Sequence, residues 1–86
     1  SPANAKAARA SLEKAVTLDG SNPHSWRLLA TAYGKTGDIP RSNLALAEEA
    51  LLQAKPDICL RQAGNAAARL TEASPSRLRA EDLKRV

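Results

Sequence analysis

The chain has 86 residues, with 13 Lys or Arg, 9 Asp or Glu, a net charge of +4 and a single cysteine. A chain of this length forms one small domain with a limited core, because folding hides only about 60% of its unfolded surface. One cysteine excludes an internal disulfide, no apolar run reaches the roughly 18 residues of a membrane span, and the modest charge is that of an ordinary solvated surface.

Helical periodicity and helix-start signals together predict an all-α fold of about five helices. Alanine is abundant, Phe and Met are absent, and the alternation typical of strands is missing. A capping oxygen followed by proline marks three helix starts, at Ser1-Pro2, Asn22-Pro23 and Ser74-Pro75. Pro56 must interrupt the third helix, since proline inside a helix costs about 3 kcal/mol. The predicted helices are 3–18, 23–36, 40–54, 57–71 and 75–84.

Each of the first four predicted helices carries an apolar stripe at helical spacing, and the fifth is mostly polar. In the second helix, Trp26, Leu29, Ala30 and Tyr33 recur at i, i+3, i+4 and i+7. The stripes predict a core made of Leu12, Ala15, Trp26, Leu29, Ala30, Tyr33, Leu46, Ala47, Leu51, Ala63, Ala66 and Leu70. The polar fifth helix is expected to cap a helical stack.

The second helix and the turn after it resemble a tetratricopeptide (TPR) repeat. The resemblance rests on Trp26, Leu29, Ala30, Tyr33 and the Gly37-Asp38 turn, which fall at the spacing of the repeat's first helix. It implies antiparallel helical hairpins stacked as a short right-handed superhelix, in a single TPR-like domain over residues 1–86. Such a domain is expected to bind protein.

Three longer segments resemble the TPR region of one particular protein family. Residues 27–34, 44–52 and 74–82 resemble the C-terminal TPR region of bacterial zinc metallopeptidases of the HExxH type. This resemblance implies a C-terminal fragment that docks a substrate or partner for an adjoining protease domain in the periplasm or cell envelope. Any zinc would lie in that other domain, and no cofactor is expected here. Ala54 departs from the family, which usually has glycine there.

The sequence contains no recognisable set of catalytic or metal-binding residues. A zinc hydrolase of this type needs two histidines on one helix face with a glutamate between them, and this chain has only His24. The adjacent Glu48 and Glu49 have no histidine at a ligand spacing. Cys59 is interpreted as a small apolar residue on a buried face. No catalytic or metal-binding residue is therefore predicted, and the fragment is not expected to be an enzyme.

Binding is predicted on the face of two helices opposite their apolar stripes. Ridges of residues four apart there could hold an acidic peptide or a terminal carboxylate by charge-assisted hydrogen bonds. The candidate residues are Arg27, Thr31, Lys35, Arg61, Asn65 and Arg69. The alternative interpretation is that these six residues are simply solvated positions. A self-association module or stand-alone adaptor is the alternative function, and no nucleic-acid partner is expected, because basic clusters with stacking aromatics are absent.

Overall fold

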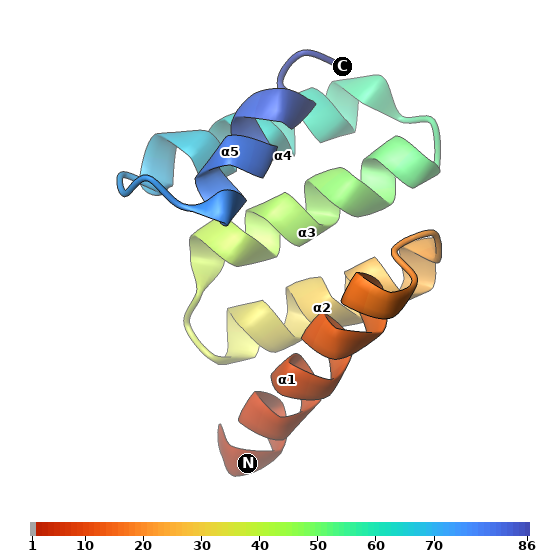
Figure 1. The fold of residues 1–86 in the computed structure, drawn as a ribbon, viewed down its shortest axis with the longest axis vertical. Coiled ribbons are helices and arrows are strands. Elements are labelled where there is room, and N and C mark those ends of the chain that lie inside the picture. Colours follow the sequence, from red (N-terminus) through yellow and green to blue (C-terminus); the bar gives the residue numbers. More distant parts are fainter. Residues whose placement is uncertain (1) are drawn as a thin grey trace.

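The computed structural model describes residues 2–86, and these form five α-helices in the order of the chain (Figure 1). The helices are α1 (Pro2–Leu18), α2 (Pro23–Lys35), α3 (Ile39–Leu52), α4 (Pro56–Arg69) and α5 (Pro75–Leu83). The predicted all-α fold of antiparallel hairpins is confirmed. Two predicted ends were wrong by two residues, since α3 ends at Leu52 and α4 ends at Arg69, and the other boundaries agree to within one residue.

The helix starts follow from the capping residues. The side chain of Asn22 accepts a hydrogen bond from the His24 amide at 2.9 Å, and Ser74 accepts one from Arg77 at 3.1 Å. Asp38 does the same for Arg41 at 3.3 Å. Each cap satisfies an amide that the first turn of a helix leaves without a partner. The predicted cap at Ser1 lies outside the described residues.

Helix α3 is the centre of the stack. It packs against α2 on one side and against α4 and α5 on the other, whereas α1 contacts only α2 (Figure 1). Helices α2 and α4 do not touch each other, because α3 lies between them. The described ends of the chain therefore lie at opposite ends of the stack.

The core is built largely from alanines, which allow neighbouring helices to approach closely. One cluster joins Leu29, Ala30 and Tyr33 of α2 to Ala45 of α3. The other two clusters join α3, α4 and α5 through Ala47, Ala50, Cys59, Ala63, Leu83, Ala66, Leu70 and Ala80. Four further residues of the predicted core, Leu12, Trp26, Leu46 and Leu51, are only partly buried and pack against the edges of the clusters.

One residue of the predicted core is exposed. The inner face of α1 carries Leu12 and Val16, and Ala15 points to solvent. The prediction placed Ala15 in the core because residues at i and i+3 share a helix face. Since α1 has a single neighbouring helix, its buried stripe is too narrow to include both Ala15 and Val16.

The same turn geometry ends both α2 and α3. After α2, the Asp38 amide donates to the Tyr33 carbonyl at 2.9 Å and the Gly37 amide to the Gly34 carbonyl at 3.2 Å. After α3, Lys55 donates to Ala50 at 2.9 Å and Ala54 to Leu51 at 3.1 Å. This is the Schellman motif, whose penultimate residue is left-handed. That residue is Gly37 (φ 79°) in the first turn and Ala54 (φ 56°) in the second.

We expect Ala54→Gly to stabilise the protein. A non-glycine residue in the left-handed region costs about 1–2 kcal/mol, and glycine removes this strain. Glycine also has more conformational freedom in the unfolded chain, which offsets about 0.5–1 kcal/mol of the gain. The net gain in the free energy of unfolding should be about 0.5–1 kcal/mol, measured by urea denaturation. The reciprocal change, Gly37→Ala, should lower it, and only through strain, because an added Cβ there meets no atom within 4 Å. A destabilised Ala54→Gly variant would contradict this account of the turn.

Candidate functional site

The structure separates the six residues of the predicted basic surface. Arg27 is engaged in an ion pair with Glu49 of α3, and the Thr31 hydroxyl donates to the Arg27 carbonyl at 3.2 Å. Thr31 and Lys35 line a hollow beside α1. On α4, Arg61, Asn65 and Arg69 are exposed, and Arg69 lines a different hollow near the α4–α5 loop. Because α3 lies between α2 and α4, the two ridges do not adjoin.

Two buried glutamates on α3 were not anticipated as structural charges. Glu49 is 7% exposed, and its carboxylate accepts a hydrogen bond from Arg27 Nε at 3.1 Å and forms an ion pair with Arg27 Nη2 at 2.8 Å. Glu48 is 9% exposed and accepts from Arg79 of α5 at 2.7 and 2.8 Å. The Glu48 hydrogen bonds raise the pKa of Arg79. The sequence did contain a signal for these pairs: Glu48 and Glu49 lie inside a run rich in leucine and alanine, and a buried carboxylate needs a charged partner.

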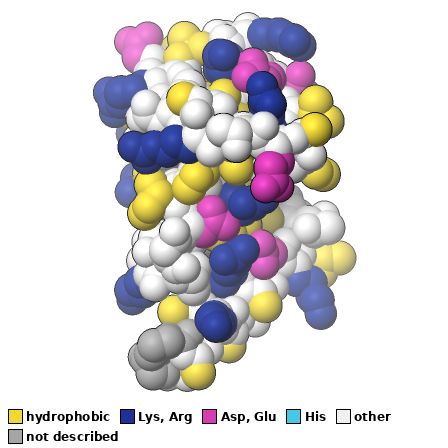
Figure 2. Space-filling model, turned by 90° about the vertical axis from the view of Figure 1, so that its left-hand side faces the viewer, with side chains coloured by type: hydrophobic (Ala, Val, Ile, Leu, Met, Phe, Trp, Pro, Cys, Tyr) yellow, Lys and Arg dark blue, Asp and Glu magenta, His cyan; other side chains and the backbone are white. Residues whose placement is uncertain are grey.

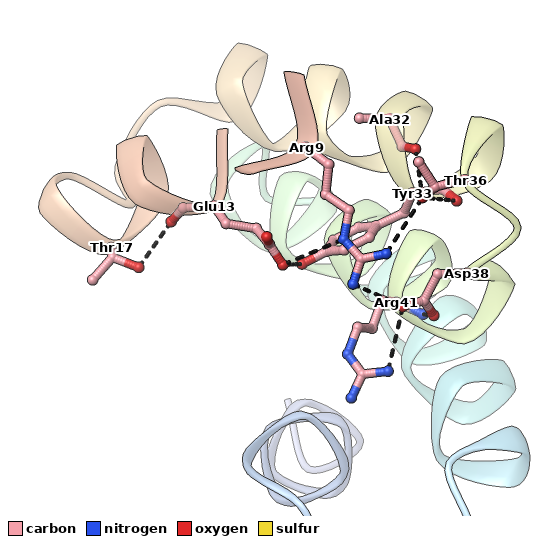
Figure 3. Close-up of polar contacts among 8 residues, drawn as sticks. All are labelled: Arg9, Glu13, Thr17, Ala32, Tyr33, Thr36, Asp38 and Arg41. Carbon is pink, nitrogen blue, oxygen red and sulfur yellow. Dashed lines mark hydrogen bonds and ion pairs between the residues drawn. The ribbon is translucent and has the colours of Figure 1, made fainter. Parts of the chain in front are cut away.

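A polar network fastens α1 to the α2–α3 turn, as Figure 3 shows. The Arg9 guanidinium lies 4.9 Å from the centre of the Tyr33 ring and 3.5 Å from the Asp38 carboxylate. The Tyr33 hydroxyl donates to Glu13 at 2.7 Å. Asp38 also caps α3, so the same carboxylate holds both α1 and the start of α3. These side chains are committed to holding the fold together.

The free energy of unfolding should fall at alkaline pH because of the Tyr33 phenol. Burial and the hydrogen bond to Glu13 raise its pKa well above the ordinary value of about 10. The contribution of Tyr33 to the free energy of unfolding is therefore complete below about pH 10, the pKa of tyrosine in the unfolded chain. It declines as the pH rises above that value. An absorbance titration reports this residue alone, since the chain has one tyrosine. Tyr33→Phe should lose less stability than the wild type above that pH. Equal losses in the two proteins would contradict the assignment.

A cleft opens between α1 and α5, and its walls already have partners. It has a volume of about 390 Å³ and exists because α1 contacts neither α3 nor α5. Its polar lining includes Glu13 and the Glu48–Arg79 pair. Those carboxylates are bonded to Tyr33 and Arg79, so a ligand in the cleft would have to compete with bonds that hold the helices.

A second hollow, the α1–α2 groove, is largely apolar, and no other helix of the described residues covers it. Its volume is about 470 Å³, and its lining residues are Asn4, Ala5, Ala8, Leu12, Leu28, Thr31, Ala32 and Lys35. Leu28 is 43% exposed although it is a large apolar residue. Lys35 is the one charged residue of this lining, and no carboxylate is in it. Leu28 and Ala8 therefore offer exposed apolar surface at this groove.

Charges elsewhere on the surface are mixed. Figure 2 shows basic and acidic side chains interspersed along one face of the molecule, with no broad area of a single sign. In α5 and at its C-terminal end, charged side chains form ion pairs with each other, such as Lys84–Glu81 and Arg85–Asp82. This face therefore has no continuous basic stripe of the kind that follows a nucleic-acid backbone.

The remaining candidate reactive residues are isolated from one another. Cys59 is 0% exposed, and burial raises the pKa of its thiol, which disfavours the nucleophilic thiolate. His24 is exposed near the start of α2. Within residues 2–86, no three His, Cys, Asp or Glu side chains are grouped as metal ligands would be. None of the helices described has the length and apolar character to cross a membrane.

Comparison of the chain with protein-family models, with curated proteins and with solved structures finds no match.

Proposed function

We propose that this chain is a protein-interaction module that binds a helix of another protein in the α1–α2 groove. The observation that carries the proposal is the apolar lining of that groove, where the exposed Leu28 and Ala8 lie beside the partly buried Ala5 and Leu12 and the buried Ala32. Exposed apolar surface rimmed by polar residues is typical of protein-binding sites. Among the described helices, α1 packs against α2 alone, and the groove lies along this pair.

A helix is the partner element that this groove suits best. Where two helices of this molecule pack closely, at α3 and α4, the contact includes the buried residues Ala47, Ala50, Ala63 and Cys59, with the partly buried Leu44, Leu51 and Ile58 packed against them. The groove has the same mixture of small side chains with a few leucines. A third helix could therefore lie on α1 and α2 as α4 lies on α3, with Leu28 as its main apolar contact.

The proposed function is tested by selecting amphipathic helical peptides that bind the protein from a displayed library. We expect Leu28→Asp to abolish binding of the selected peptides while leaving the helical content of the protein unchanged. The matched control is Leu60→Asp on α4, since Leu60 is 38% exposed and lies outside the groove. Binding that survives Leu28→Asp, or is lost equally in Leu60→Asp, would show that the groove is not the binding site.

We further propose that the module serves an adjoining zinc metallopeptidase domain, as the resemblance of residues 27–34 and 44–52 implies. The module would hold a protein substrate or partner while a separate domain carries out hydrolysis. In a longer chain that contains such a domain, Leu28→Asp should slow cleavage of a groove-binding protein and leave cleavage of a short peptide unchanged. Equal effects on both substrates would contradict this role.

A further inference from the structure

We propose that the occupant of the α1–α2 groove is an acidic amphipathic helix of a partner protein, and that it is not a second copy of this chain. This inference rests on the proposed function and specifies the chemistry of the partner. It rests on three observations: the positive charge at the groove, the bonds that already occupy the nearby carboxylates, and the charges on this chain's own helices.

The groove presents positive charge only. Lys35 lies at the end of the lining formed by the last turn of α2, next to Asn4 from the first turn of α1. Lys35 is exposed and has no ion pair or hydrogen bond from its side chain within the described residues.

The carboxylates of the α1–α2 hairpin do not offset this charge. The hairpin, residues 2–35, contains two of them, Glu13 and Asp19. Glu13 accepts from the Tyr33 hydroxyl and contacts Arg9, and Asp19 accepts from the Ser21 hydroxyl at 2.6 Å. Neither carboxylate lines the groove. A partner helix therefore gains most from acidic side chains beside its apolar stripe, near Lys35.

Among the described helices, none offers a purely acidic face beside an exposed leucine. On α4, the exposed Asp57 lies three residues before Leu60, but the exposed Arg61 is next to Leu60. The two carboxylates at the centre of α3 are buried against Arg27 and Arg79. On α5, the exposed Leu78 is accompanied by acidic residues, but Asp82 is paired with Arg85 and Glu81 with Lys84. A second copy would bring more basic residues to a basic groove. Charge complementarity therefore favours a different protein as the partner.

The test uses three synthetic helical peptides with one shared Leu/Ala stripe and with Glu, Gln or Lys at the flanking positions. Fluorescence anisotropy at low salt should give the Glu peptide about 3- to 10-fold tighter binding than the Lys peptide, the range expected from exposed charge pairs. Added salt should shrink this difference. Lys35→Glu should reverse the order of the peptides. Arg61→Glu, which changes the net charge equally on α4, should leave the order unchanged.

The alternative outcomes separate the two proposals. Equal binding of all three peptides, abolished by Leu28→Asp, would overturn the acidic partner and leave the helix-binding function standing. Failure of every peptide to bind would overturn the function itself. A reversal produced by Arg61→Glu would show that net charge, and not the groove, sets the preference. Sedimentation that reveals a wild-type dimer, dissociated by Leu28→Asp, would identify a second copy as the occupant.

Discussion

Leu29→Ala is expected to lower the free energy of unfolding by about 2–5 kcal/mol, the usual cost of removing a buried leucine side chain. Leu29 is 1% exposed and packs in the cluster that joins α2 to α3. A domain of 86 residues has a total stability of roughly 4–13 kcal/mol at typical values per residue. The variant should therefore be partly unfolded at room temperature if the protein lies near the lower end of that range.

The adjacent residue supplies the control. Leu28 lies on the same helix but is 43% exposed, so Leu28→Ala should cost less than about 1 kcal/mol. Urea denaturation followed by circular dichroism measures both variants under the same conditions. Comparable losses for the two leucines would mean that the packing of α2 on α3 has been assigned to the wrong face of the helix.

Arg79→Ala should lower the free energy of unfolding by about 2–3 kcal/mol, because it leaves a charged carboxylate without its partner. Glu48 is 9% exposed, and the only hydrogen bonds that its side chain accepts within the described residues come from Arg79. The cost falls below that of a fully enclosed pair, since the Arg79 side chain is 46% exposed and Glu48 lines the α1–α5 cleft.

Two comparisons isolate the ion pair. Arg85→Ala removes a looser pair with Asp82, 3.3 Å apart, whose side chains are 79% and 60% exposed, and it should change stability by less than about 0.5 kcal/mol. The double variant Glu48→Leu, Arg79→Leu should recover most of the loss, since it removes both charges. If Arg79→Ala costs no more than Arg85→Ala, Glu48 is hydrated and the pair does not hold α5 to α3.

The helices could be predicted from the sequence because their signals are local. Asn22 and Ser74 begin helices by bonding amides two or three residues away, and proline fixes the first helical residue. The stripe of Leu29, Ala30 and Tyr33 also lies within a single helix. Each of these signals depends on neighbours in the sequence, so no knowledge of the tertiary arrangement was needed.

The surfaces could not be predicted in the same way, because they depend on which helices meet. Arg27 has the spacing of a solvent-facing ridge, but the packing of α2 on α3 places it against Glu49. Glu48 meets Arg79 only because α5 folds back onto α3. The exposure of Ala15 likewise follows from the single neighbour of α1. A helical period gives the faces of a helix, whereas partners from other helices decide what each face does.

The peripheral position of α1 also bears on how the protein opens. A helix with one neighbour can separate from it while α2 to α5 keep their mutual contacts, so its amides should exchange with deuterium before those of α3. The contacts of Arg9 with Tyr33 and Asp38 oppose this separation of α1 from α2. A guest helix seated beside Leu28 would give α1 a second neighbour, and the slowing of its exchange would measure how tightly the guest is held.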